Sequence, residues 1–310
     1  MYSEVFSAIH HAALRVTDLD EASRRWSHVL GLTGGIEDGR ALLRCAHEDY
    51  ALVLEQSSQK PGLEYVAYEL APGVSLSTMR SRLGSHGVEI KEIEVPRRGT
   101  GLRFSDPDGN GVVVIEYLRQ ADSRPAEVLY SDVLPGFHPR KFGHVNYLTS
   151  NVSLAVQWYI DVPGFKLTDG IGAEGRWLHV NADHHVLAFL EKGYNHIHHL
   201  AFELVDWGEM RVALDHLAQN RRYIVWGPGR HGMARNLFSY FRMHEEELFV
   251  ELFADMERLP LNHEPRYFPD DAHSSNTWGI LPPRSYFRFD DEAIRSELEQ
   301  FAAHADYLTV

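Results

Sequence analysis

The second half of the chain repeats the residue pattern of the first half. Residues 11–32, HAALRVTDLDEASRRWSHVLGL, parallel residues 144–165, HVNYLTSNVSLAVQWYIDVPGF. Further along, EYVAYEL at 64–70 parallels HHLAFEL at 198–204 at an almost unchanged offset. Because the register holds over such a long stretch, the sequence predicts two halves with the same fold.

Each half contains the same order of local patterns. A short run of alternating apolar and polar residues, typical of a strand, leads to a helix N-cap candidate, Asp18 or Asn151, and then to helical spacing. A second strand and a second helical pattern, at 74–87 or 207–220, follow in each half. We therefore predict an α+β fold of two tandem domains, each built from two βαβββ modules that form a curled sheet around a cavity.

The repeat also sets the expected domain boundaries. The first repeat domain spans 1–118 and the second, catalytic one spans 139–255. Residues 119–138 carry two prolines and mixed charge and are interpreted as the linker. Residues 256–310 lie outside the repeat, and their proline-rich stretch and final amphipathic helix are expected to cover the site or an interface.

Composition narrows the class of protein. The formal net charge of −14 disfavours nucleic-acid binding, and no apolar run is long enough to span a bilayer. A single cysteine, Cys45, excludes an internal disulfide framework, and the N-terminus lacks a signal-peptide pattern. We expect a cytoplasmic protein without membrane or nucleic-acid partners, and a homo-oligomer, since closed symmetric assemblies are common among soluble enzymes.

Three residues of the second half stand at corresponding inward positions on separate strands: His144, His199 and Glu251. The matching positions of the first half are read as His11, Tyr65 and Glu116, the last from the alignment of GVVVIEY at 111–117 with LFVELF at 248–253. Two imidazoles and one carboxylate on one face form the ligand set that leaves open coordination positions on Fe(II). Since a tyrosine interrupts the set in the first half, we predict one metal, in the second half.

Neighbouring histidines leave an alternative open. His198 should face the opposite side of the strand from His199, because side chains alternate, and it is the second candidate ligand. A lone strand histidine is more often a buried structural residue, and His10 and His11 are interpreted that way.

Further polar residues flank the predicted ligands. DHHVLAF at 183–189 offers His184 and His185, and GPGRHGMARNLFSYF at 227–241 offers His231 and Tyr240. Imidazoles titrate near neutral pH and a tyrosine hydroxyl is a strong hydrogen-bonding group. Each alone could be a loop or core residue, but as a set they favour an active site.

These motifs, together with GHVN at 143–146 and VEL at 250–252, resemble the type I extradiol catechol dioxygenases, which have the vicinal oxygen chelate fold. The resemblance covers residues 5 to about 255. It implies an enzyme that uses Fe(II), with Mn(II) as the second possibility. Such an enzyme inserts both atoms of O2 into a catecholic ring beside the vicinal diol, giving a ring-opened semialdehyde in aromatic degradation.

The resemblance also implies individual roles. The iron ligands would be His144, His199 and Glu251. His185, preferred to His184 by spacing, would be the acid/base. His231 and Tyr240 would bind the catechol by hydrogen bonds, and Asn146 would be a further substrate contact.

The second half departs from the family pattern. The first half keeps DPDGN at 106–110, whereas the second has FRMHEEELFVEL at 241–252, with a turn of three acids, Glu245–Glu247. Glu251 remains the expected ligand because it lies in the apolar strand.

The substrate-binding end is less determined. Four aromatic residues could line the ring pocket or belong to the core: Trp177, Phe189, Trp226 and Phe241. In the tail, His273 and Arg284 could recognise an anionic group or lie on the surface.

Two other functions fit the fold. One is a glyoxalase-like metal isomerase or lyase, which tends to use four protein ligands; Tyr65 and the set His185, His231 and Tyr240 disfavour it. The other is a metal-free small-molecule binding protein, which would not need a complete ligand set. The fold alone does not separate these classes.

Overall fold

The computed structural model describes residues 2–46, 48–118 and 137–305. The expected linker, 119–138, therefore lies almost wholly outside the described residues. Within the described part, no helix combines the length and apolar character needed to cross a membrane.

Two βαβββ modules form one eight-stranded sheet in the first half. The first module consists of β1 (Phe6–Val16), α1 (Leu19–Leu30), β2 (Thr33–Glu37), β3 (Arg40–Arg44) and β4 (Leu52–Gln56). The second consists of β5 (Gly62–Leu70), α2 (Leu76–Ser85), β6 (Lys91–Val95), β7 (Gly99–Ser105) and β8 (Gly111–Ile115). The strand order is β2-β3-β4-β1-β5-β8-β7-β6, so the antiparallel pair β1 and β5 joins the modules.

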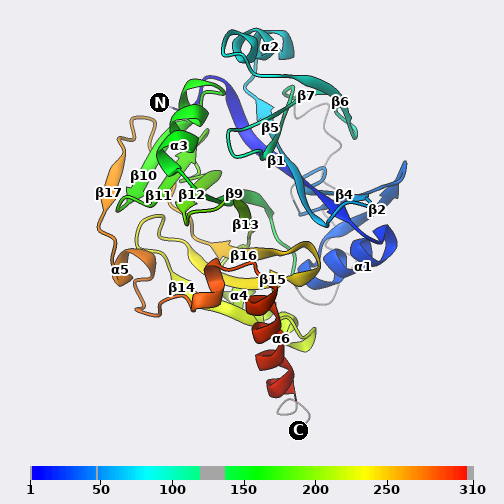
Figure 1. The fold of residues 1–310 in the computed structure, drawn as a ribbon, viewed down its shortest axis with the longest axis vertical. Helices are drawn as coiled ribbons and strands as arrows, with labels where there is room; N and C mark the ends of the chain where they lie inside the picture. Colours follow the sequence, from blue (N-terminus) through cyan, green and yellow to red (C-terminus); the bar gives the residue numbers. More distant parts are fainter. Residues whose placement is uncertain (1, 47, 119–136, 306–310) are drawn as a thin grey trace.

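The second half repeats this plan. Its first module consists of β9 (Lys141–Thr149), α3 (Val152–Asp161), β10 (Lys166–Ile171), β11 (Gly175–His179) and β12 (Leu187–Glu191). Its second consists of β13 (His196–Glu203), α4 (Trp207–Gln219), β14 (Ile224–Arg230), β15 (Leu237–Met243), the 3-10 turn η1 (His244–Glu246) and β16 (Leu248–Ala254). The strand order is β14-β15-β16-β13-β9-β12-β11-β10-β17. The predicted fold class, with four βαβββ modules in two curled sheets, is confirmed (Figure 1).

The predicted helix starts are also confirmed. Asp18 accepts a hydrogen bond from the Glu21 amide at the start of α1, and Asn151 accepts one from Leu154 at the start of α3. Such caps satisfy amide groups that the first turn of a helix leaves without partners. Each helix begins directly after the inner strand of its module, which keeps β1 and β9 in equivalent places.

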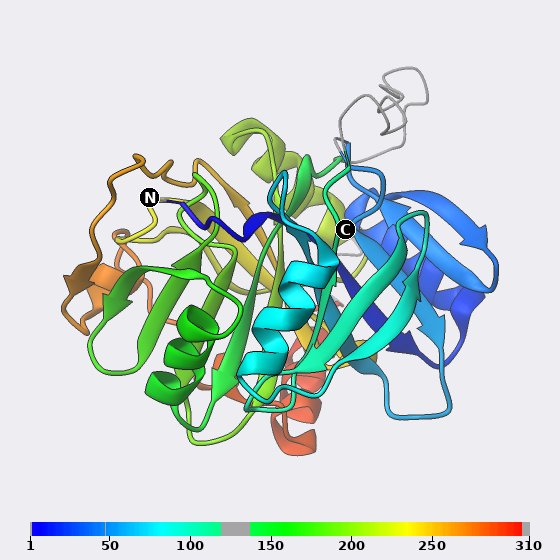
Figure 2. The same cartoon turned by 90° about the horizontal axis from the view of Figure 1, so that it is seen from above.

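The two sheets share one apolar core. Along β9, Val145 and Tyr147 face this core, whereas His144 and Asn146 face the opposite side, as the alternation of strand side chains requires. Helices α2 and α3 lie on the same side of the molecule (Figure 2), and Arg82 of α2 donates to the Asp161 carbonyl at the end of α3. The residues that face away from this core therefore form the inner surfaces of the two curled sheets.

The inner surface of the first sheet is filled rather than open. Its apolar cluster includes Tyr65, Ala67 and Val113, packed with the residues Ala13, Leu42, Tyr50, Val53, Val95 and Ile115. His11 is fully buried there, and its Nε2 lies 3.3 Å from the Tyr65 hydroxyl.

The predicted correspondence of Glu116 with Glu251 is wrong. In the sheets, Ala201 pairs with Glu251, whereas the equivalent Ala67 pairs with Val113. The chain between these paired positions is longer in the second half, so the numbering no longer matches the pairing. Glu116 instead follows β8, is exposed, and accepts a hydrogen bond from the Leu76 amide. The first half thus lacks two of the three ligand positions, not one.

The tail wraps around the second sheet. It forms β17 (Arg266–Phe268), α5 (Ala272–Ser275), the 3-10 turn η2 (Arg284–Phe287) and α6 (Asp291–Ala305). Strand β17 pairs in parallel with β10 at the sheet edge, and α5 follows it along the same side (Figure 1). A buried ion pair anchors α6, since Arg242 of β15 lies 3.0 Å from Glu297.

Candidate metal centre

Three side chains of the second sheet converge on one point. The Nε2 atoms of His144 and His199 lie 3.0 and 3.1 Å from Oε2 of Glu251. The two imidazole nitrogens are themselves 3.3 Å apart. All three side chains are buried, and their ligand atoms lie within 4.8 Å of one another. The structure thus brings together the three residues that the sequence singled out.

Sheet register explains this convergence. Strands β16, β13 and β9 are neighbours, and Ala201 pairs with Glu251 on one side and His144 on the other. Glu251 and His144 therefore flank Ala201, while His199, two residues along β13, points to the same face. The small alanine side chain between them leaves space at the centre.

The charges of the three groups suit a cation. Burial lowers the pKa of His144, which keeps its imidazole neutral. Burial would raise the pKa of Glu251, but the neighbouring His144 and His199 hold it well below its usual range. Two imidazole nitrogens and one carboxylate oxygen aimed at a common point match the donor set of a divalent metal.

Asn236 orients the carboxylate. Its Nδ2 donates to Oε1 of Glu251 over 3.0 Å, and the asparagine is fully buried. Oε1 is thereby occupied, and Oε2 is the oxygen turned toward the histidines. Such outer contacts fix the orientation of a metal ligand.

His198 sets the tautomer of His199. Its Nε2 lies 2.8 Å from the Tyr286 carbonyl oxygen, which can only accept, so Nε2 carries the proton. Burial lowers the pKa of His198 well below its usual range, so the ring is neutral and its Nδ1 accepts from the His199 Nδ1, 2.7 Å away. The lone pair of His199 is consequently on Nε2, the atom that faces Glu251. His198 faces away from the site and is not placed as a ligand.

The pair His184–His185 is connected in the same way. The Nε2 of His184 donates to Asp169 over 2.9 Å, and its Nδ1 lies 3.1 Å from the Nδ1 of His185. Burial opposes ionisation of Asp169, but hydrogen bonds from His184 and from Arg266 of the tail lower its pKa to about 2. Burial also lowers the pKa of His185 well below its usual range, so this imidazole is neutral. In the tautomer in which His185 Nδ1 donates to His184, the lone pair of His185 is on Nε2.

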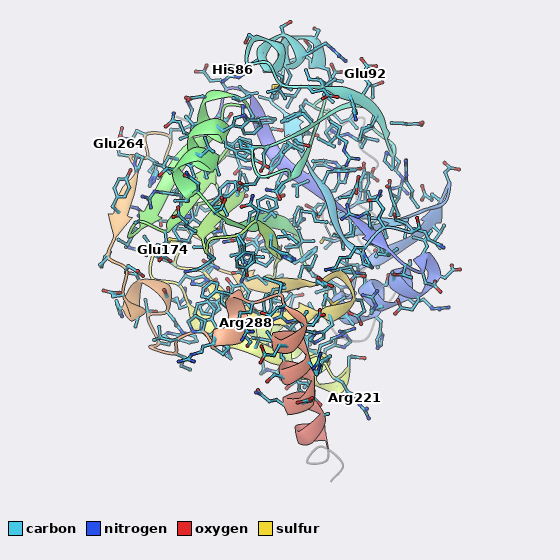
Figure 3. All side chains as sticks on the ribbon, in the orientation of Figure 1. His86, Glu92, Glu174, Arg221, Glu264 and Arg288 are labelled. Atoms are coloured by element: carbon cyan, nitrogen blue, oxygen red, sulfur yellow. The ribbon has the colours of Figure 1, made fainter. Side chains whose placement is uncertain are left out.

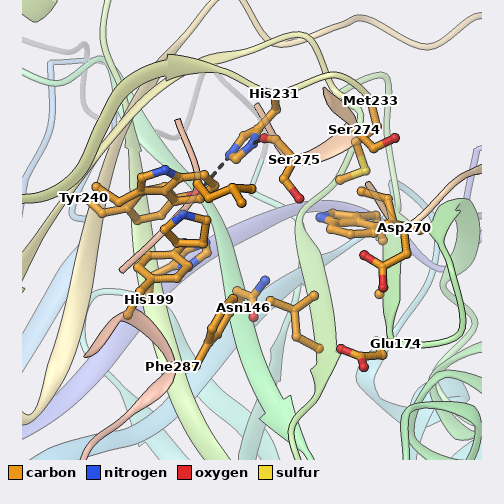
Figure 4. Close-up of a pocket in the computed structure, with 18 of the residues that line it drawn as sticks. Asn146, Glu174, His199, His231, Met233, Tyr240, Asp270, Ser274, Ser275 and Phe287 are labelled. Carbon is orange, nitrogen blue, oxygen red and sulfur yellow. Dashed lines mark hydrogen bonds between the residues drawn. The ribbon is translucent and has the colours of Figure 1, made fainter. Parts of the chain in front are cut away.

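His231 and Tyr240 form the third polar element. The Nδ1 of His231 donates to the Ser275 carbonyl over 2.7 Å, and its Nε2 accepts from the Tyr240 hydroxyl over 3.0 Å, as Figure 4 shows. Tyr240 stands directly opposite Glu251 in the ladder of β15 and β16. Burial, together with the charge of Glu251, raises the pKa of Tyr240 well above its usual range, so the hydroxyl keeps its proton.

One cavity of about 410 Å³ is lined by six of these residues: His144, His185, His199, His231, Tyr240 and Glu251. Asn146 and Trp177 line it, as the sequence suggested, and Asn146 Oδ1 has no hydrogen-bond partner among the described residues. Phe189 is elsewhere: it is fully buried and packs against Tyr147 and Tyr159 in the shared core.

The other suggested pocket residues divide in the same way. Trp226 lines the cavity, whereas Phe241 belongs to the shared core. His273 and Arg284 are exposed and do not line the cavity. The tail nevertheless contributes to the cavity wall through α5 and the segment Leu281–Phe287.

Several residues of the site escaped sequence reasoning: Asp169, Asn236, Arg266, Ser275 and Tyr286. Asn236 had a signal, since it directly precedes β15 and the spacing N-x-F-x-Y places it in register with Phe238 and Tyr240 of that strand. Ser275 and Tyr286 act through backbone carbonyls, which no side-chain pattern reveals.

Comparison with known proteins agrees with this arrangement. Residues 8–114 and 141–242 match the model of the Glyoxalase/Bleomycin resistance protein/Dioxygenase superfamily. The chain belongs to this superfamily. The two matched segments correspond to the two halves of the repeat.

Curated relatives in this superfamily are ring-cleaving dioxygenases by name. Metapyrocatechase 2 of Cupriavidus necator is 27% identical over 274 residues, covering 82% of each chain. The manganese-dependent 2,3-dihydroxybiphenyl 1,2-dioxygenase of Geobacillus genomosp. 3 is 26% identical over 265 residues, covering 79% of this chain and 84% of the relative.

Solved structures show the same fold. The substrate complex of homoprotocatechuate 2,3-dioxygenase from Brevibacterium fuscum, with bound 3,4-dihydroxyphenylacetate, superimposes with a TM-score of 0.82. It is 20% identical, and the match covers 92% of both chains.

Proposed function

We propose that this member of the superfamily is an extradiol ring-cleavage dioxygenase. It would insert both atoms of O2 into a catecholic ring beside the vicinal diol and release a ring-opened semialdehyde. The observation that carries the proposal is the cluster of His144, His199 and Glu251 at the base of a cavity that also presents His185, His231 and Tyr240. The names of the curated relatives support the same reaction class.

His144, His199 and Glu251 would hold one divalent metal, Fe(II) or Mn(II). When bound, such a metal in a three-ligand site offers open positions for a chelating catechol and O2 and lowers the pKa of the catechol hydroxyl groups. The donor set does not distinguish the two metals, and one relative is named as manganese-dependent.

The surrounding residues can move and hold protons. The lone pair on His185 Nε2 makes this neutral imidazole a base for a substrate hydroxyl proton, and its ring lies 4.2 Å from that of His144, beside the metal position. Tyr240 donates to His231, and its phenol oxygen can in addition accept a hydrogen bond from the substrate. The unpartnered Oδ1 of Asn146 is a further acceptor toward the cavity. His185 can later return the proton to an oxygen of the opened ring.

The buried group of three potential metal ligands favours a metal-dependent oxygenase over a metal-free binding protein. Two imidazole nitrogens and one carboxylate oxygen lie within 4.8 Å of one another in a buried setting, a complete ligand set that a metal-free binding protein would not need. A glyoxalase-like isomerase would call for a fourth protein ligand, whereas the metal-binding group found within the described residues has three.

The decisive experiment combines metal binding with turnover. We would reconstitute the protein anaerobically with Fe(II) or Mn(II), then follow oxygen uptake and product absorbance with several catechols. We expect stoichiometric metal and a coloured ring-opened product. His199→Ala and Glu251→Ala should abolish both, and His11→Ala in the first sheet should leave metal content unchanged. Bound metal without catechol turnover would refute the dioxygenase proposal, and absence of metal binding would refute the metal centre itself.

A further inference from the structure

The cavity has an outer end that the proposed chemistry does not use. Figure 4 shows Glu174 and Asp270 on the side of the pocket away from His199 and Tyr240. Between the two ends, the wall is mainly apolar and includes the side chains of Ile171, Trp177, Leu190, Met233, Leu281 and Phe287. A ring chelated at the metal would therefore direct a substituent along apolar surface toward this outer end.

The outer end carries more negative than positive charge. Its charged lining residues are Glu174, Lys192, Asp270 and Asp271. Lys192 is the one Lys or Arg side chain among the described residues that line the cavity. Its Nζ lies 2.5 Å from Glu174 and 4.6 Å from the centre of the Phe287 ring, so it is already engaged.

The two aspartates differ in their contacts. Asp271 caps α5 by accepting from the Ser274 amide over 2.7 Å. Asp270 is exposed at the cavity mouth and makes no side-chain hydrogen bond or ion pair within the described part of the chain. A carboxylate entering here would meet like charge and no free cation, which disfavours anionic groups.

The volume is larger than an unsubstituted catechol requires. A cavity of about 410 Å³ falls in the range of roughly 300–1,000 Å³ that holds drug-sized ligands. Apolar walls of this extent are stabilised when an apolar substituent displaces water from them.

We propose that the preferred substrate is a catechol whose ring bears an uncharged apolar substituent of several carbon atoms, and that carboxylate-bearing catechols are disfavoured. Glu174 and Asp270 are the residues that determine this selectivity. The inference rests on the proposed dioxygenase function and specifies its substrate class.

Three catechols of similar size isolate the effect of charge: 4-ethylcatechol, 3,4-dihydroxyphenylacetate and 3,4-dihydroxyphenethylamine. With the metal-loaded enzyme we expect kcat/KM for the neutral compound to exceed that for the anion by roughly tenfold or more, since two carboxylates each disfavour it. The cationic compound should react at least as well as the neutral one. 4-Butylcatechol should exceed catechol in kcat/KM because it fills the apolar wall.

Two variants test which residues cause the discrimination against the anionic catechol. The double variant Glu174→Gln and Asp270→Asn removes two charges and frees Lys192, so the ratio of kcat/KM for the anion to that for 4-ethylcatechol should rise roughly tenfold. Glu264→Gln is the matched control, because Glu264 is exposed on the same tail but outside the cavity lining (Figure 3). It should leave the order of substrates unchanged.

The outcomes distinguish the substrate proposal, its assignment to two residues and the proposed dioxygenase function. A wild-type enzyme that prefers the anion, or treats all three alike, overturns the substrate proposal while the dioxygenase function stands. Discrimination that persists unchanged in the double variant overturns the assignment to Glu174 and Asp270. A protein that binds metal but opens no catechol overturns the proposed function and this inference with it.

Discussion

Replacing His198 with phenylalanine tests whether a residue behind the metal centre determines metal affinity. His198 is fully buried and joins the Tyr286 carbonyl to Nδ1 of His199. Phenylalanine keeps a flat ring beside Phe249, whose ring centre lies 5.2 Å away, so packing is largely retained. The substitution removes the acceptor that holds the proton of His199 on Nδ1.

Two effects of different size follow. The Tyr286 carbonyl and the His199 Nδ1–H would each lack a partner, which costs about 1–3 kcal/mol per buried group in unfolding free energy. Loss of a partner behind a ligating histidine typically lowers metal affinity by about 10–100-fold. We therefore expect His198→Phe to fold with reduced stability and to bind Mn(II) or Fe(II) about 10–100-fold more weakly.

The first sheet supplies the matched control. His10 and His11 form an equivalent pair, with 2.8 Å between their Nδ1 atoms, at a place that holds no predicted metal. Metal titration of the apoprotein, read by electron paramagnetic resonance of free Mn(II), should give wild-type affinity for His10→Phe. Wild-type affinity in His198→Phe, or equal loss in both variants, would refute the reasoning.

Three further predictions concern stability. Because the pKa of Asp169 is depressed from 3.8 to about 2, Asp169→Asn should lower the unfolding free energy by about 1–2 kcal/mol at pH 7 in urea titrations. This stabilisation is fully present above about pH 4 and is lost as the pH falls toward 2, so a difference that does not shrink on acidification would contradict the assignment. Glu297→Gln would leave Arg242 buried without its counter-charge, and thermal unfolding should show a loss of about 3–5 kcal/mol; a loss below about 1 kcal/mol would argue against α6 being anchored by this pair. Metal at 100 times its Kd should add about 2.7 kcal/mol of stability that a chelator removes, and Glu251→Gln should show no such dependence.

Much of the fold was predictable because the repeat carries it. Asp18 and Asn151 begin helices at the same point of each half, and the strand patterns fix which face is buried. Two of the three candidate ligands were predictable for the same reason, since His144 and His199 fall at repeat-equivalent inward positions, whereas Glu251 was predictable from its place in an apolar strand. Comparing the halves supplied information that a single copy would not contain.

The errors have a common physical origin. Glu116 was matched with Glu251 by its position in the sequence. The pairing between strands, however, sets which residue faces the cavity. The longer connection in the second half shifts that pairing. Phe189 was a candidate for the ring pocket, yet strand alternation turns it toward the core. The carbonyl of Tyr286 and the carboxylate of Asp169 reach the site from distant segments, so only tertiary structure reveals them.

Each sheet contains a pair of adjacent histidines joined by a hydrogen bond between their Nδ1 atoms. The donor and the acceptor of this bond are exchanged between the two sheets. In the first sheet, Arg98 donates to Nε2 of His10 over 3.1 Å, so the proton of His10 is on Nδ1 and is donated to His11. Burial lowers the pKa of His11 to about 3, and this neutral ring must then carry its proton on Nε2, facing Tyr65.

In the second sheet, the Tyr286 carbonyl accepts from His198, and the direction reverses, which places a lone pair on His199 Nε2. A hydrogen-bond donor beside the first histidine of the pair leaves the second histidine with an N–H at Nε2, which repels a cation. An acceptor there leaves the second histidine with a lone pair at Nε2, which can bind a metal. The tail that supplies this carbonyl is therefore part of the candidate metal centre, although none of its described side chains belongs to the group of three residues that could hold a metal. If the second sheet binds metal as proposed, attachment of the tail through Arg242 and Glu297 would couple the stability of α6 to that binding.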